Sequence, residues 1–203
     1  MAIHPVNFYN HLVKNGIDFF TGVPDSLLKE FCLCIDDYGL KKKHIIAANE
    51  GNAIALAAGY YFAEKSIPMV YMQNSGLGNA INPLLSLCDS DVYAIPMLIM
   101  IGWRGEPGFK DEPQHIKQGK IQLDLLNSMD IPYDIIEKDD SKFEEQILSL
   151  IEITKKENKP VVLLIRKGTF AKYKKQSNDD VNEGMKREEA LELILNSVDR
   201  DAI

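Results

Sequence analysis

The sequence is poor in the features that mark secreted, membrane and nucleic-acid-binding proteins. It has three cysteines in 203 residues, two of them spaced as Cys32-x-Cys34, so it lacks an even disulfide set and the further nearby ligands of a structural zinc site. No charged and then apolar leader opens the chain, and its longest apolar stretch, Val92 to Trp103, is too short to cross a bilayer. The net charge of −7 disfavours nucleic acid and anionic membranes as partners. We therefore expect a soluble, cytoplasmic protein with reduced thiols.

Short β-rich runs alternate with helical stretches along most of the chain, a pattern typical of parallel strands joined by helices on both faces. Several of the runs are apolar throughout, as expected for strands that are covered on both sides. The pattern predicts a doubly wound, three-layer α/β/α domain over residues 1–168 with a mostly parallel, six-stranded sheet. The predicted strands are 19–22, 44–48, 69–73, 97–101, 133–136 and 161–165, and the predicted helices lie near 5–15, 25–37, 50–65, 77–88, 119–129 and 141–157.

The composition changes after Arg166. Lys172 to Gly184 is polar and charged, with almost nothing to bury, so we expect a linker over residues 169–185. A new helical pattern begins at Lys186, and an amphipathic helix without a partner in the chain is typical of the start of another domain. Residues 186–203 are therefore predicted to open a truncated second domain.

The turns after the predicted strands are the places to look for function, because ligands of open parallel sheets bind beyond the carboxyl ends of the strands. Glu50 opens a helix that is apolar nearly all round. It either favours the positive helix end beside Asn49 as cap, or lies in a partly dry cleft where desolvation disfavours the anion. Asn74 to Asn79 contains two glycines and is either a tight strand-to-helix turn or a place where backbone approaches a ligand. Neither a dinucleotide fingerprint nor a phosphate loop is present.

A loop of about fifteen residues, from Trp103 to Lys117, is predicted to have no regular element, and such loops are usually functional or disordered. It carries Arg104, Lys110 and His115. These side chains either are solvated or meet an anionic substrate, since an arginine fork suits phosphonate oxygens and lysine acts as a point charge. His115 is either a proton relay or a bystander.

Taken in order, the strand-end motifs resemble those of phosphonopyruvate decarboxylases, which are related to sulfopyruvate decarboxylases and more widely to pyruvate-decarboxylase-like thiamin enzymes. The resemblance runs from about residue 3 to the end of the chain. It rests on five motifs, which are Thr21 to Ser26, Ala48 to Ala53, Tyr71 to Asn79, Ile101 to Gly108 and Asp111 to His115.

This resemblance implies an aminopyrimidine-binding (PYR) domain for thiamin diphosphate, in an enzyme that converts 3-phosphonopyruvate to phosphonoacetaldehyde and CO2 in phosphonate biosynthesis. Glu50 matches the glutamate that hydrogen-bonds N1′ of the aminopyrimidine. Asp25 and His115 are candidates for substrate contact or proton transfer, although His115 follows Gln114 where pyruvate decarboxylases have a histidine pair. Arg104 and Lys110 are hypothesised substrate contacts from their charge alone. The residues implied to border the cofactor are Gly22, Val23, Pro24, Asn74, Ser75, Gly76, Gly78 and Asn79.

The resemblance also implies a missing half. The family binds the diphosphate and Mg2+ with a Gly-Asp-Gly…Asn segment on a second domain, and these 203 residues contain no such segment. We therefore expect no metal ligand in this chain, a site completed by the diphosphate-binding domain of another chain, and a homo-oligomer, most simply a dimer. Alone the fragment should be inactive. Two alternatives stay open, namely a sulfopyruvate decarboxylase subunit, whose domains lie on separate chains, and a non-catalytic α/β binding module.

Overall fold

The computed structural model describes residues 1–39, 43–138, 141–176 and 185–197. In chain order its elements are α1 (Pro5–Lys14), β1 (Phe20–Gly22), α2 (Lys29–Tyr38), β2 (His44–Ile46), α3 (Glu50–Glu64), β3 (Met69–Gln73), the 3-10 turn η1 (Asn74–Gly76), α4 (Leu77–Pro83), the π-helical turn η2 (Leu84–Cys88), β4 (Met97–Gly102), α5 (Pro113–Ser128), β5 (Tyr133–Ile136), α6 (Phe143–Glu157), β6 (Pro160–Ile165) and α7 (Arg187–Ser197).

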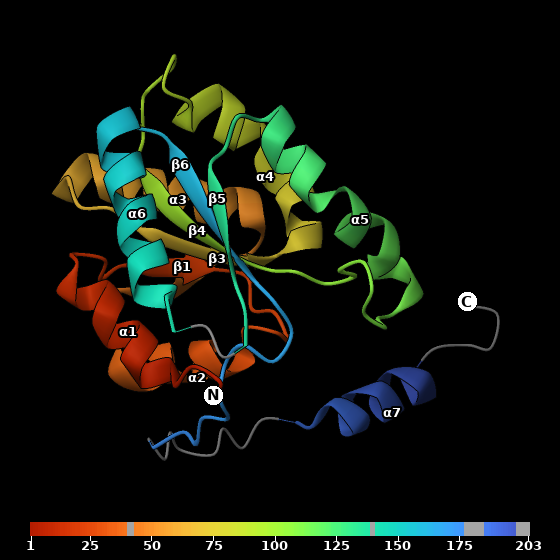
Figure 1. Cartoon of the computed structure of the whole chain (residues 1–203). Helices are drawn as coiled ribbons and strands as arrows, with labels where there is room; N and C mark the ends of the chain where they lie inside the picture. Colours follow the sequence, from red (N-terminus) through yellow and green to blue (C-terminus); the bar gives the residue numbers. More distant parts are fainter. Residues whose placement is uncertain (40–42, 139–140, 177–184, 198–203) are drawn as a thin grey trace.

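The six strands form one parallel sheet in the order β2-β1-β3-β4-β6-β5. Helices α1, α2 and α6 cover one face, and α3, α4 and α5 cover the other (Figure 1). Every residue of β4 and β6 is buried, because both faces of these central strands lie under helices. The predicted doubly wound α/β/α fold is confirmed.

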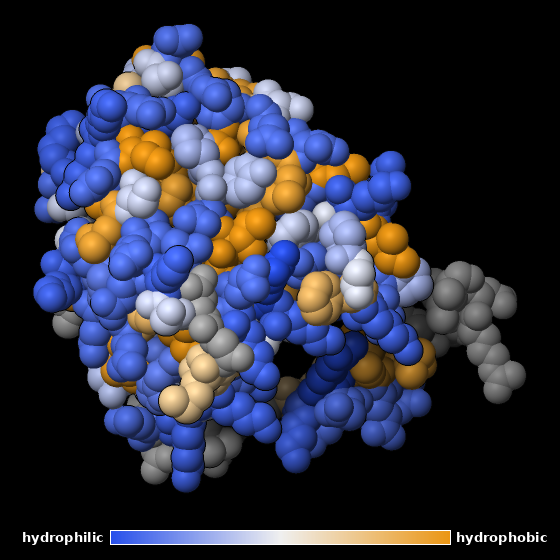
Figure 2. Space-filling model, in the orientation of Figure 1, coloured by the Kyte–Doolittle hydropathy of each residue, from blue (hydrophilic) through white to orange (hydrophobic). Residues whose placement is uncertain are grey.

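Each face of the sheet has its own apolar core. Under α1 and α2, the rings of Phe8, Phe31 and Phe170 contact one another, with the centroids of Phe8 and Phe31 5.3 Å apart. Under α3 and α4 the core is built from smaller side chains, among them Ala53 and Ala57, which let α3 approach the sheet closely. The surface drawn in Figure 2 is mainly hydrophilic, with hydrophobic residues in small groups between hydrophilic ones.

Two predicted boundaries were wrong. Helix α5 begins at Pro113 rather than near 119, because proline at the first position is pre-set for a helix and needs no donor there. The predicted loop from Trp103 to Lys117 therefore ends at Glu112. Helix α2 begins at Lys29 rather than near 25, because the Asp25 carboxylate accepts a hydrogen bond from the Leu27 amide and holds a turn before the helix.

The first residues of the predicted linker pack on the folded body. Phe170 pairs with Ile3 in an isolated bridge, and Tyr173 is buried with its hydroxyl 2.7 Å from Asp37 Oδ2. Helix α7 buries none of its residues. Residues 177–184 of the predicted linker and 198–203 of the predicted second domain lie outside the described residues, so this division of the chain stays a prediction. No described helix has the length and apolar content needed to cross a membrane.

Candidate functional site

The sheet order reverses direction between two neighbouring strands, β1 and β3. The chain passes from β1 outward to β2 and then returns past β1 to β3. Helix α2, after β1, covers one face of the sheet, whereas α4, after β3, covers the other. The turns that follow β1 and β3 therefore diverge, which is the arrangement that accommodates ligands in open α/β sheets.

Glu50 lies at this edge, at the first residue of α3. Asn49 caps the helix, as expected, since its side-chain oxygen accepts a hydrogen bond from the Asn52 amide at 3.0 Å. The Glu50 carboxylate accepts a hydrogen bond from Asn79 Nδ2 at 2.8 Å. It also lies directly against Gly76, where an added β-carbon would be 2.3 Å from Glu50 Oε1. The structure thus brings Glu50, Gly76 and Asn79 together from two different turns.

Gly22 ends β1 and allows Tyr71 of β3 to lie over it. An added β-carbon at Gly22 would be 2.0 Å from the Tyr71 carbonyl oxygen and 2.7 Å from its ring. The Tyr71 hydroxyl lies 2.8 Å from His44 Nε2, and His44 Nδ1 lies 3.1 Å from Asp36. Burial raises the pKa of Tyr71 and lowers that of His44. Gly22 therefore makes room for Tyr71, whose hydroxyl begins a polar chain through His44 to the exposed Asp36.

Asp25 is a buried carboxyl group in the same turn. Its Oδ2 accepts the Leu27 amide hydrogen bond at 2.8 Å and occupies space that a β-carbon at Gly102 would need. Its Oδ1 is buried and has no hydrogen-bond partner among the described residues. Burial raises the pKa of Asp25, while the nearby Arg104 opposes the shift. A cavity of about 360 Å³ adjoins it, lined by Pro24, Asp25, Ser26, Lys29, Cys32, Leu33, Asp36, His44, Ile46 and Tyr71.

Asn74 and Arg104 connect the turns after β3 and β4. The fully buried Asn74 side chain donates to the Arg104 carbonyl at 2.8 Å and accepts from the Arg104 amide at 3.2 Å. The Arg104 guanidinium pairs with both oxygens of Asp111, and its Nη1 donates to Ser26 Oγ at 2.9 Å. Arg104 was singled out as a substrate contact, but in the structure a carboxylate already compensates its charge.

The other predicted residues lie less closely packed at this edge. Ser75 and Gly78 are exposed, and Ser75 Oγ accepts a hydrogen bond from Gln73. Lys110 is exposed, and within the described residues no hydrogen bond or ion pair of its ammonium group is seen. His115 lies half-buried on the first turn of α5, not in a loop.

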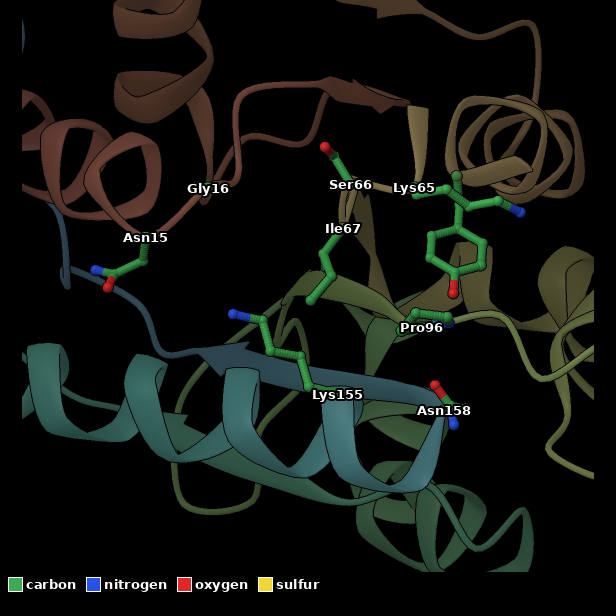
Figure 3. Close-up of a pocket in the computed structure, with 9 residues that line it drawn as sticks. Asn15, Gly16, Lys65, Ser66, Ile67, Pro96, Lys155 and Asn158 are labelled. Carbon is green, nitrogen blue, oxygen red and sulfur yellow. The ribbon is translucent and has the colours of Figure 1, made fainter. Parts of the chain in front are cut away.

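Another cavity of about 360 Å³ lies at the opposite edge of the sheet and contains none of the predicted site residues. Figure 3 shows Lys155 and Asn158 at the end of α6, facing the segments that contain Ile67 and Pro96 before β3 and β4. This edge holds the amino ends of the strands, where doubly wound folds do not place their ligands. Cavity size alone therefore does not locate the site.

The comparisons with known proteins show the family of the chain. The family model described as thiamine pyrophosphate enzyme, N-terminal TPP binding domain, matches residues 7–127. A phosphonopyruvate decarboxylase of Streptomyces viridochromogenes is 38% identical over 122 residues, which cover 60% of this chain and 30% of that protein. A sulfopyruvate decarboxylase subunit alpha of Methanothermobacter thermautotrophicus is 32% identical over 158 residues, which cover 77% of this chain and 92% of that subunit. The chain thus matches less than a third of the first relative and most of the second.

Solved structures agree in fold. The benzoylformate decarboxylase of Polynucleobacter necessarius superimposes with a TM-score of 0.61 at 17% identity, over 92% of this chain and 33% of that one. The thiamine diphosphate-dependent 4-hydroxybenzoylformate decarboxylase of Rhodococcus jostii RHA1 gives 0.60 at 15% identity, over 95% and 36%. With the family match over more than half of its length, the chain belongs to the thiamine pyrophosphate enzyme family, of which it contains the N-terminal TPP binding domain.

Proposed function

We propose that this chain is the aminopyrimidine-binding half of a thiamin-diphosphate-dependent decarboxylase that converts 3-phosphonopyruvate to phosphonoacetaldehyde and CO2. One observation carries the proposal, which is the Glu50 carboxylate held by Asn79 against the bare backbone of Gly76 at the carboxyl end of the sheet. The relatives named phosphonopyruvate decarboxylase support this choice of substrate.

The residues present fit the aminopyrimidine of thiamin diphosphate. A β-carbon at Gly76 would fill the space that the Glu50 carboxylate occupies, so the turn is shaped for a carboxylate at this point. Asn79 binds Glu50 Oε2, which leaves Oε1 to meet a ring nitrogen. The glycine-containing turn beside Glu50 offers backbone groups to a flat ring. Gly22, Val23, Pro24, Asn74, Ser75, Gly76, Gly78 and Asn79 remain the proposed border of this ring.

In this proposal Glu50 shares a proton with N1′ of the pyrimidine, and Asn79 keeps the carboxylate aimed at that nitrogen. When bound, thiamin diphosphate supplies the electron sink that lets the carboxyl group leave a 2-oxo acid as CO2. Asp25 and His115 are the proposed groups for substrate contact or proton transfer. Of the two proposed cation contacts, Lys110 has its charge available, whereas Arg104 is compensated by Asp111.

The proposal requires another chain. The diphosphate and Mg2+ are proposed to bind to a second domain supplied by a partner, in a homo-oligomer or with a separate subunit in the cytoplasm. The relatives named subunit alpha support a requirement for a further chain.

Glu50→Gln tests the function in the complete enzyme, that is, this chain with its diphosphate-binding domain. We expect turnover of 3-phosphonopyruvate to fall by on the order of 10² to 10⁴-fold, the usual contribution of a proton-transfer group. Circular dichroism and the melting temperature should stay unchanged. Glu64→Gln, at the exposed far end of the same helix, is the matched control and should keep full activity. Undiminished turnover of Glu50→Gln would favour the non-catalytic binding module.

Sulfopyruvate is the second candidate substrate, because subunit alpha relatives match at similar identity, 37% over 125 residues in Methanococcus maripaludis. Phosphonate and sulfonate differ in charge, so a site built for the first should discriminate between them. Measuring kcat/KM for both substrates with the complete enzyme separates the two candidates. We expect a higher kcat/KM for 3-phosphonopyruvate. A higher kcat/KM for sulfopyruvate would identify the enzyme as a sulfopyruvate decarboxylase instead.

A further inference from the structure

Asp111 is the acceptor at the centre of the loop between β4 and α5. Its Oδ2 accepts hydrogen bonds from Arg104 Nε and the Gly105 amide, both at 2.8 Å. Its Oδ1 accepts from Arg104 Nη2 at 2.5 Å and from the Glu112 amide at 2.8 Å. The hydrogen bonds from Arg104, more than any other contact, hold the pKa of Asp111 far below its usual range, so Asp111 is ionised.

The loop between β4 and α5, which contains Asp111, is held by contacts with α5 and with the turn after β3. Gly105 has a φ of 68°, and its bare α-carbon lies against the His115 carbonyl, where a β-carbon would be 1.9 Å away. Trp103 Nε1 donates to the Gly119 carbonyl at 2.9 Å. Asn74 fixes the backbone of Arg104. Only the long side chain of Arg104 then remains free to change rotamer. Its bidentate ion pair with the Asp111 carboxylate removes this freedom.

The direction imposed on Arg104 matters for the site. With one edge on Asp111, the guanidinium reaches across the strand ends to Ser26 Oγ, at 2.9 Å, in the turn that also contains Asp25. Arg104 is close enough to Asp25 to lower its pKa against the effect of burial. Burial raises the pKa of the Cys32 thiol in α2, and the negative charge of Asp25 adds to this rise. Three turns, after β1, β3 and β4, therefore meet at one arginine.

We infer that Asp111 is a positioning residue: through Arg104 it fixes the Ser26 hydroxyl and places a positive charge beside Asp25. The geometric part of this inference is independent of the proposed function, and only its catalytic consequence rests on that function. The Arg104 side chain therefore connects the turns after β1 and β4, and its ion pair with Asp111 fixes the direction of the guanidinium.

The test reads the charge beside Asp25 directly. The aspartates of this chain are labelled with ¹³C at the carboxyl group, Asp25 is assigned with Asp25→Asn, and its titration is followed by NMR. In Asp111→Asn the guanidinium loses its anchor and swings away, so the pKa of Asp25 should rise, as it should in Arg104→Gln. If Arg104 stayed in place without Asp111, its uncompensated charge would lower the pKa of Asp25 instead. The sign of the shift therefore distinguishes the two possibilities.

Controls keep the outcome decisive. Asp124→Asn, an exposed carboxylate on α5, should leave the Asp25 titration unchanged. Asp111→Glu moves the carboxylate by one methylene and should give a smaller rise than Asp111→Asn. A fall or no change in Asp111→Asn, or no rise in Arg104→Gln, overturns the inference. Loss of folding in both Asp111 variants also overturns it, because Asp111 would then support the fold as a whole.

In the complete enzyme, Asp111→Asn should lower kcat/KM by on the order of 10²-fold, the cost of a misplacement of about 1 Å. Combining Asp111→Asn with Arg104→Gln should lower kcat/KM no further than Arg104→Gln alone, because both changes remove the same connection between the turns. Additive losses would contradict the inference. If the wild-type enzyme decarboxylates neither substrate, the proposed function fails, while the NMR titration still decides the role of Asp111.

Discussion

At the scale of single residues, two glycines of one turn differ in what surrounds them. A β-carbon at Gly76 would lie 2.3 Å from Glu50 Oε1, whereas at Gly78 it would meet nothing within 4 Å. Gly76→Ala should therefore displace the Glu50 side chain and lower the turnover of the complete enzyme by about 10²-fold. Gly78→Ala adds a β-carbon that meets no other residue, so it should lower turnover much less than Gly76→Ala does. Equal steady-state kinetics for the two variants would mean that the contact between Gly76 and Glu50 has no functional weight.

Asp25 gives a prediction on stability. Burial raises its pKa above the usual 3.8, so the folded state binds the proton more tightly than the unfolded chain does. The stabilising contribution is therefore fully present below about pH 3.8 and is lost as pH rises through the folded-state pKa. Above the raised pKa the ionised carboxylate is destabilising, so Asp25→Asn should raise the free energy of unfolding there.

Urea unfolding of the Asp25→Asn variant and of the wild type at a series of pH values checks this expectation. The difference between them should shrink as pH falls toward the usual carboxyl pKa. The same change at the exposed Asp91 is the control and should give no such trend. A variant that is less stable than wild type at neutral pH would show that the Asp25 carboxylate is favourable where it lies.

Most of the candidate residues were singled out from the sequence because they lie at or just after the end of a predicted strand. Their partners could not be found in this way. The bond between Glu50 and Asn79 spans 29 positions, and the bond between Arg104 and Ser26 spans 78. No local pattern encodes such pairs. For Arg104 the charge alone suggested a substrate contact, whereas its ion pair with Asp111 is visible only in the structure.

At the scale of elements, α5 shows the limits of periodicity. Residues 113–118 are mostly polar and show no helical pattern of apolar side chains. The first turns of α5 were therefore predicted as loop. The signal that could have found it is the proline itself, which favours the first position of a helix. The central strands were easier to predict, since burial on both faces leaves long apolar runs such as Met97 to Ile101.

The contact between α5 and the loop before it depends on Gly119. A β-carbon there would lie 1.8 Å from the Gly105 carbonyl oxygen, and backbone cannot yield as a side chain does. Gly119→Ala should therefore lower the free energy of unfolding by roughly 1 to 3 kcal/mol. Gly59→Ala, in α3 with nothing within 4 Å, should instead raise it by roughly 0.5 to 1 kcal/mol.

Thermal unfolding of both variants measures these changes. Amide hydrogen exchange should also be faster around Gly105 in Gly119→Ala and unaltered in Gly59→Ala. A fully stable Gly119→Ala variant would show that α5 can shift away from the loop at little cost.

At the scale of the whole molecule, the edge of the sheet at β2 is open and apolar. Ile46 is 60% exposed there, and a groove of about 690 Å³ lies between β2 and α3. Its lining is Phe19, Ile45, Ile46, Ala47, Ala48, Asn52, Ala55, Leu56, Gly59 and Tyr60. Edge strands of this kind favour association, which supports the proposal of a further chain at this site.

Ile46→Lys should therefore weaken association with the diphosphate-binding partner or with a second copy by on the order of 10²-fold, as at an interface hot spot. Analytical ultracentrifugation over a concentration series measures the change. Leu148→Lys, on the exposed side of α6, is the matched control and should associate as wild type does. Identical dissociation constants for the two variants would place the interface elsewhere.

Helix α3 links this groove to the candidate site, since it carries Glu50 at its first residue and Leu56 in the groove wall. Six residues of rigid helix, about 9 Å, separate them without a joint. A chain that packed on Leu56 would therefore contact the same helix that presents Glu50. Under the proposed function, the surface that binds the partner and the surface that binds the aminopyrimidine would adjoin along α3.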